Sequence, residues 1–151
     1  MGELLVVRQN SDFGTVILAA EAEHPSDMEL APVEDIRSLT PYGMLLASLG
    51  CCTAIVLHTY AQAHGLLLAD VQLRLTYERA FARDCEHCES EEEYQESIKQ
   101  EITLEGQLSP AERKRLLRVA DYCPIHKILS EGIQIKSSLA EETPKAAEQK
   151  A

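Results

Sequence analysis

One apolar stretch, from Thr40 to Gly65, constrains the fold of this chain more than any other part of the sequence. Thr40 can cap a first helical turn, Pro41 suits the first helical position, and Gly65 provides a left-handed stop. Apolar residues fall on nearly every face between these ends, which predicts one long helix that is buried all round. At about 1.5 Å per residue it would run roughly 35 Å, the width of a small domain. We therefore expect this helix to cross the core or a subunit interface.

The length of 151 residues predicts a single domain over residues 1–140, with a disordered tail over residues 141–151. The net charge of −11 disfavours nucleic acid and anionic membrane as partners. Polar sequence on both sides of the long helix argues against a membrane span. The N-terminus lacks the basic stretch and apolar core of a secretory signal, so we expect a cytoplasmic protein.

Short β-prone runs surround the long helix. The polar turn from Asn10 to Gly14 separates two such runs and predicts an antiparallel hairpin. The proline-containing and acidic residues 23–39 indicate a loop or short irregular elements. Alternation of apolar and polar side chains is typical of strands with one wet face. Strands are predicted over residues 3–8, 15–22, 71–81, 97–108 and 133–139.

Two further helices are predicted near the C-terminal end. Ser109 and Glu112 have the spacing of a capping box, with a helix running to about residue 121 or 122. A second, short helix is predicted to begin at Cys123-Pro124 and to end before Gly132. Strands grouped around helices in this order imply an α+β fold, an antiparallel sheet with helices on one side. The first of these helices is expected to bury Leu116, Leu117, Val119 and Ala120.

Five cysteines, at positions 51, 52, 85, 88 and 123, are an odd number without an export signal. This favours reduced thiols, metal ligands or redox chemistry over a structural disulfide framework. Cys123 precedes Pro124 and should sit at a helix cap, where free N–H groups favour a thiolate, or it simply fills a helix junction. Cys52, taken alone in the middle of a helix, indicates core packing, and Cys51 does so more strongly.

The two cysteine-bearing stretches together resemble the OsmC/Ohr family of thiol-dependent peroxidases. The matching stretches are TPYGMLLASLGCCTAIVLHTYA and ADYCPIHKIL, and the order of elements agrees over essentially the whole chain. The resemblance implies an intertwined homodimer with antiparallel sheets wrapped around long central helices and active sites at the subunit interface. It also implies that Cys52 is the peroxidatic and Cys123 the resolving cysteine, with a hydroperoxide substrate, a dithiol reductant and no cofactor.

Activation of a thiolate in the middle of a helix needs a nearby cation. The family supplies an arginine that is held by a glutamate. This sequence departs from that pattern, because Tyr42 stands where the family has an acid after the proline. Arg37 is the nearest candidate cation, and its alternative interpretation is a solvated loop arginine. Tyr42 could hydrogen-bond an arginine through its hydroxyl group.

A second departure is the motif Cys85-Glu86-His87-Cys88 in an acidic stretch. Similar Asp-Cys-x-x-Cys segments occur in a subgroup of OsmC-like proteins. The motif indicates a redox pair or loop disulfide, a zinc site completed elsewhere, or simple surface thiols.

Two histidines complete the candidates. His58 lies on a different helix face from Cys52 and is interpreted as a satisfied interface residue. His126, one turn past Cys123, either tunes that thiol or is solvated.

Three functions remain open from the sequence. The first is a thiol peroxidase acting on organic hydroperoxides through Cys52 and Cys123. The second is a dimer that binds a small ligand or senses oxidants without peroxidase turnover. The third is a metal-binding protein that uses Cys85 and Cys88.

Overall fold

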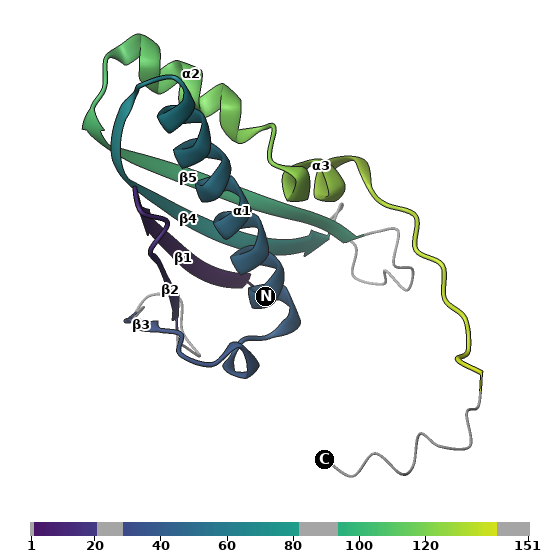
Figure 1. The fold of residues 1–151 in the computed structure, drawn as a ribbon. Coiled ribbons are helices and arrows are strands. Elements are labelled where there is room, and N and C mark those ends of the chain that lie inside the picture. Colours follow the sequence, from purple (N-terminus) through teal and green to yellow (C-terminus); the bar gives the residue numbers. More distant parts are fainter. Residues whose placement is uncertain (1, 21–28, 82–93, 142–151) are drawn as a thin grey trace.

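The computed structural model describes residues 2–20, 29–81 and 94–141, and its elements are shown in Figure 1. The predicted α+β class is confirmed, and the predicted elements from residue 3 to residue 131 are present in the predicted order, with the additional short strand β3 (Leu30–Pro32). The elements are β1 (Gly2–Asn10), β2 (Thr15–Ala20), β3 (Leu30–Pro32), the 3-10 helix η1 (Ile36–Ser38), α1 (Pro41–Ala63), β4 (Leu67–Phe81), β5 (Tyr94–Gln107), α2 (Pro110–Ala120) and α3 (Pro124–Glu131).

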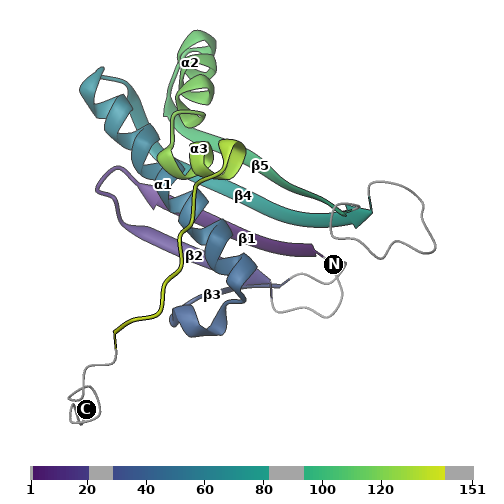
Figure 2. The same cartoon turned by 90° about the vertical axis from the view of Figure 1, so that its right-hand side faces the viewer.

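In the described residues the strands form one antiparallel sheet with the order β3-β2-β1-β4-β5. The predicted hairpin is β1 and β2. Its turn is held by Asn10, whose side-chain oxygen accepts hydrogen bonds from the N–H groups of Asp12 (3.0 Å) and Gly14 (2.9 Å). The helices α1, α2 and α3 lie on one side of the sheet (Figures 1 and 2). The short elements β3 and η1 occupy the stretch that is predicted to be irregular.

The ends of α1 are the predicted ones. The hydroxyl of Thr40 accepts a hydrogen bond from the N–H of Gly43 (3.0 Å), and Gly65 has φ +66°. Such a cap contributes about 1 kcal/mol. Burial of a large apolar side chain contributes roughly 1.5–3 kcal/mol, and both Leu46 and Leu57 are fully buried. The caps therefore set where α1 begins and ends, whereas burial sets how it lies on β1 and β4.

Gly50 allows α1 to approach the sheet closely. A Cβ atom at this position would lie 2.7 Å from Cγ2 of Val7 and 2.8 Å from Cδ1 of Leu75. Both side chains are themselves fully buried, on β1 and β4. The close approach fixes the depth of the next two residues along α1, Cys51 and Cys52, which remain half-buried.

The prediction that α1 is buried all round is wrong for a single protomer. Met44 is 36% and Ile55 47% exposed, and Ser48 and Thr59 lie on the same exposed face. These four residues recur at helical spacing and form the α1 stripe. Among the described helices, α1 alone is long and apolar enough to cross a membrane, and half of its most apolar part is buried against the rest of the protein.

The predicted helices α2 and α3 are present. Ser109 and Glu112 make the full capping box at the start of α2. Leu116 is fully buried, but Leu117 is 58% exposed, so the prediction that Leu117 is buried is wrong. It lines a cavity between α2 and β5. Gly132, with φ +86°, ends α3 as predicted.

The predicted strand over residues 133–139 is not a strand in the structure. In the described residues beyond Gly132 the chain has no regular element, and all its side chains are exposed. Figures 1 and 2 show this segment, in yellow, leaving α3 and running apart from the sheet. The segment has the alternating pattern of a strand, but no edge of its own sheet lies beside it to supply hydrogen bonds. The predicted tail lies, apart from its first residue, outside the described residues.

Candidate functional site

The structure brings Cys52 and Cys123 together, although they are separated by 71 positions in the sequence. Cys52 is half-buried on α1, and Cys123 is fully buried at the N-cap of α3. Their side chains are hydrogen-bonded to each other, and both are free thiols. A disulfide between them requires the two sulfurs to approach to about 2.05 Å.

The N-terminus of α3 contacts Cys52. The backbone N–H of Ile125, in the first turn of α3, is hydrogen-bonded to the sulfur of Cys52. The sequence pattern predicts the influence of this helix end at Cys123 and none at Cys52. Cys123 is the N-cap residue as predicted, although its side chain makes no cap hydrogen bond. The prediction that Cys52 receives no help from a helix end is wrong, because the packing of α1 against α3 brings its sulfur to a free N–H group of α3.

The pKa of Cys52 is raised in this environment. Burial is the largest cause, followed by the hydrogen bond with Cys123, while the N–H of Ile125 lowers the pKa. Negative charge on Cys123 or Cys51 would raise it further. Burial also raises the pKa of Cys51. None of the groups that set the pKa of Cys52 in the described part of the chain is a cation, so this thiol is mostly protonated at neutral pH.

The pH dependence of Cys52 alkylation should show the raised pKa of this thiol. Because a raised pKa keeps the proton on sulfur, the rate with iodoacetamide should rise with pH and level off above the range of an unperturbed cysteine. Replacing Cys123 with alanine removes a hydrogen bond that raises the pKa, so the midpoint should move to lower pH. Rates are measured by mass spectrometry with Cys51→Ala as background. A midpoint that stays unchanged in Cys123→Ala would contradict the contact between the two thiols.

Arg37 is not brought to Cys52 within the described protomer. It lies in η1, before α1 begins, whereas Cys52 lies about 16 Å further along the helix axis than Pro41. Its guanidinium makes a two-pronged contact with Asp35, at 2.6 and 2.9 Å to Oδ2, and its side chain is 87% exposed. The pairing raises the pKa of Arg37 and lowers that of Asp35.

Tyr42 stacks on the ring of Tyr77. The rings of Tyr42 and Tyr77 lie 4.6 Å apart at an angle of 23°. The hydroxyl of Tyr77 donates a hydrogen bond to Glu96 (2.7 Å), and burial together with Glu96 raises the pKa of Tyr77 to about 12. Position 42 therefore contributes to an aromatic contact between α1 and the sheet.

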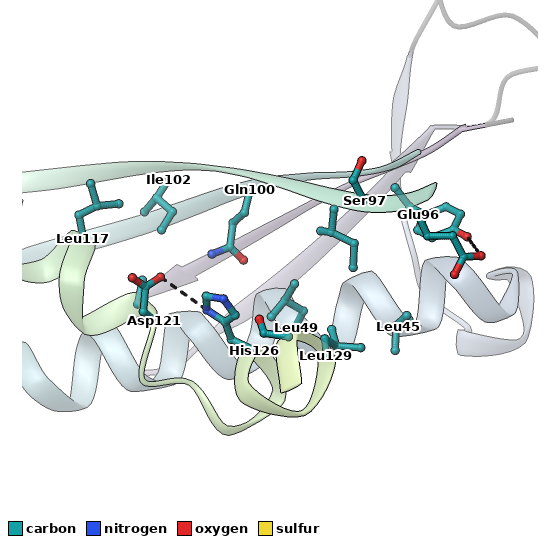
Figure 3. A pocket seen from close by; sticks show the side chains of 14 residues that line it. Leu45, Leu49, Glu96, Ser97, Gln100, Ile102, Leu117, Asp121, His126 and Leu129 are labelled. Atoms are coloured by element: carbon teal, nitrogen blue, oxygen red, sulfur yellow. Dashed lines mark hydrogen bonds and ion pairs between the residues drawn. The ribbon is translucent and has the colours of Figure 1, made fainter. Parts of the chain in front are cut away.

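A cavity of about 430 Å³ lies between β5 and the three helices (Figure 3). Its apolar wall includes Leu45 and Leu49 of α1. Its polar groups include Gln100 on β5 and the pair formed by Asp121 and His126, whose Oδ1 and Nδ1 atoms lie 3.6 Å apart. Neither Gln100 nor Asp121 carries a sequence signal, because their approach depends on how α2 and α3 fold back over β5.

A second, more open groove of about 790 Å³ lies between α1 and α2. Apolar side chains including Val56 line it, and Arg115 contacts the ring and the hydroxyl of Tyr60 there. Cys52 is one helical turn from Leu49, which lines the cavity, and one turn from Val56, which lines the groove. Neither Cys52 nor Cys123 is among the residues that line the cavity or the groove.

His58 is buried inside its own protomer, and its interpretation as an interface residue is wrong. It is 1% exposed, and its Nε2 atom lies 2.9 Å from the carbonyl oxygen of Gln9 on β1. The motif from Cys85 to Cys88 lies outside the described residues, so its alternatives remain predictions. Within the described residues there is no group of three or more histidines, cysteines and acids that could hold a metal ion.

Comparisons with known proteins agree with the α+β fold. Residues 34–138 match the family model described as OsmC-like protein. The fold is similar to the crystal structure of an OsmC-like hydroperoxide resistance protein from Jannaschia sp. CCS1, with a TM-score of 0.61 and 15% sequence identity. That similarity covers 94% of this chain and 96% of the other, and at this identity it shows the fold alone. None of the curated proteins compared with the chain matches it.

Proposed function

Because the chain belongs to the OsmC-like protein family, we propose that it reduces organic hydroperoxides with Cys52 as the peroxidatic and Cys123 as the resolving cysteine. The observation that carries the proposal is the hydrogen-bonded thiol pair between α1 and the start of α3. The similar protein from Jannaschia is described as a hydroperoxide resistance protein, which is consistent with this chemistry. A cytoplasmic location is part of the proposal, since dithiol reductants keep thiols reduced there.

The proposed cycle uses only the two thiols, a hydroperoxide and a dithiol. The Cys52 thiolate attacks the terminal oxygen of the hydroperoxide, the O–O bond breaks, and the products are a sulfenic acid and an alcohol. The Cys123 thiol then condenses with the sulfenic acid, forming the disulfide and releasing water. A dithiol reduces the disulfide by exchange and is itself oxidised to a disulfide. No bound cofactor takes part.

The N–H of Ile125 would help to stabilise the Cys52 thiolate during the attack. A hydrogen bond to the charged form of a group favours that form, and this N–H belongs to the positive end of α3. Arg37 stays a prediction as the activating cation. In its own protomer Arg37 pairs with Asp35. It could therefore activate Cys52 only from a partner subunit, and only after its ion pair with Asp35 breaks.

A homodimer is also proposed. The α1 stripe leaves Met44 and Ile55 in solvent, and the segment beyond Gly132 exposes Ile133 (62%), Ile135 (82%) and Leu139 (98%). Exposed apolar side chains at helical and strand spacing fit contacts with a second copy of the chain. In such a dimer the segment 133–141 would pair with the partner's sheet and complete the predicted strand.

A stoichiometric oxidation tests the proposed cycle. One equivalent of cumene hydroperoxide should remove two thiols from the protein, and peptide mass spectrometry should find the new disulfide between positions 52 and 123. The double variant Cys85→Ser, Cys88→Ser serves as background, so that these thiols cannot contribute. If the thiols of Cys52 and Cys123 were both still present after exposure to excess hydroperoxide, the cycle would be excluded.

The raised pKa of Cys52 favours one alternative, a dimer that binds a small ligand or senses oxidants without turnover. A mostly protonated thiol reacts slowly with peroxide. In that case native mass spectrometry should detect a ligand retained by the purified protein, and Cys52→Ser should keep it.

A further inference from the structure

The groove between α1 and α2 combines apolar walls with positive charge. The two helices lie side by side (Figure 2), and the groove follows α1 from Ile55 to Ala63, roughly 12 Å along the helix axis. Arg115 and Arg118 of α2 line it, whereas no aspartate or glutamate is among the described residues that do so. The whole chain carries a net charge of −11. The groove is therefore locally positive on an acidic protein, which favours an anionic occupant.

The guanidinium of Arg115 is held in place by Tyr60. Its Nε donates a hydrogen bond to the Tyr60 hydroxyl, and its central carbon lies 5.1 Å from the centroid of the Tyr60 ring. The ring of His64 stacks on the same tyrosine, with 4.0 Å between the centroids. These contacts use only Nε of Arg115, so the N–H groups of its two terminal nitrogens stay available. Such a pair of N–H donors matches the two oxygens of a carboxylate.

Arg118 adds a second cation one helical turn further along α2. Within the part of the chain that the structure describes, it has neither an ion pair nor a hydrogen-bond partner for its side chain. Like charges on neighbouring turns of one helix face repel each other. An anion bound between Arg115 and Arg118 would remove this repulsion.

The groove has a polar end and an apolar end. Arg115 contacts Tyr60 and Cys123 contacts Cys52, so the chain from α2 to α3 runs along α1 in the opposite direction. The arginines therefore lie beside the C-terminal part of α1, and the other end of the groove lies beside its middle.

The apolar end consists of Ile55 and Val56 of α1 and of Val119 and Tyr122. Ile55 and Tyr122 are exposed to solvent. An alkyl chain that lies along these side chains would remove apolar surface from water. The groove volume of about 790 Å³ is in the range of sites that bind small molecules.

From these contacts we propose that the groove binds an amphipathic carboxylate, that is, one carboxylate on an alkyl chain of medium length. Arg115 and Arg118 hold the carboxylate, and the chain lies over Val119 toward Ile55. Neither cysteine of the thiol pair lines the groove, so this binding goes beyond the proposed peroxidase function and does not rest on it.

Equilibrium dialysis of the full chain against decanoate, below its micelle-forming concentration, tests the proposal. The expected result is one saturable site per protomer. Octanoate should bind roughly tenfold more weakly, because each buried CH₂ group contributes about fourfold to the affinity. Decan-1-ol has the same chain without the charge, and it should bind at least about tenfold more weakly than decanoate.

Matched variants of α2 locate the carboxylate. Arg118→Gln should raise the dissociation constant for decanoate by about tenfold or more, since a charged hydrogen-bond donor is lost. Lys114→Gln is the control, because it removes the same charge from the same helix at a residue that does not line the groove. It should leave the dissociation constant unchanged.

Three results would overturn the proposal. Equal affinities for decanoate and decan-1-ol, or equal affinities of Arg118→Gln and Lys114→Gln for decanoate, would show that the arginines hold no carboxylate. The third is the absence of saturable binding. If the dimer dissociation constant then rises in Arg118→Gln but not in Lys114→Gln, the occupant is a second copy of the chain, since Ile55 and Thr59 of the α1 stripe also line the groove.

Discussion

Replacing Cys52 with serine is expected to lower peroxide turnover by at least about 1,000-fold, the scale on which removal of a catalytic nucleophile acts. The hydroxyl is close in size to the thiol, so α1 should still pack on the sheet and the fold should persist. Cys123 cannot replace Cys52, because it is fully buried at the start of α3. The measurement is consumption of cumene hydroperoxide with dithiothreitol as reductant, with circular dichroism to verify the fold.

Two neighbouring variants sharpen this expectation. Cys123→Ser should still be oxidised at Cys52 and should accumulate a sulfenic acid that dimedone traps, because the resolving thiol is gone. Cys51→Ser is the matched control, since it alters the adjacent half-buried thiol and should retain turnover. If Cys52→Ser consumed peroxide at the rate of the unsubstituted protein, the proposed chemistry would be wrong.

Deleting residues 133–151 is expected to weaken dimerisation by at least about 100-fold. The deletion removes Ile133, Ile135 and Leu139, whose full burial by a partner would contribute roughly 1.5–3 kcal/mol each. The cost of ordering the segment reduces this gain, but a remainder of about 2.7 kcal/mol already corresponds to 100-fold in the dissociation constant. Light scattering over a dilution series measures the change.

A shorter deletion provides the control for this experiment. Removing residues 142–151 keeps the three exposed apolar side chains, so the dissociation constant should stay the same. The double variant Ile133→Ser, Ile135→Ser should reproduce most of the effect of the long deletion without shortening the chain. A long deletion that left the dissociation constant unaltered would assign the whole interface to the α1 stripe.

Much of the fold could be predicted because its signals are local. The caps of α1 and α2 depend on residues within one turn, such as Thr40 with Gly43 and Ser109 with Glu112, and all of them form as predicted. The wrong predictions concern whether an apolar side chain has a neighbouring element that buries it. The middle of α1 and the segment 133–139 have the apolar pattern of buried elements, but burial depends on a neighbour, and a single protomer does not supply one on every side.

Of the candidate site, the approach of the two cysteines could be predicted from the sequence, whereas the position of Arg37 and the electrostatics could not. Motif resemblance is sufficient to select Cys52 and Cys123, and the structure places them in contact. The N–H of Ile125 carries no sequence signal, because every residue except proline has such a group. For Arg37, nearness in sequence to α1 does not indicate nearness to Cys52 in space, since a helix separates residues by about 1.5 Å at each step.

The unequal depth of the two sulfurs gives the regeneration step a direction. In a disulfide between Cys52 and Cys123 only the sulfur of Cys52 has access to solvent, because Cys123 is fully covered. An incoming dithiol must therefore attack at position 52, form its mixed disulfide there and release Cys123 as the leaving thiolate. Solvent access thus determines which of the two sulfurs the reductant attacks.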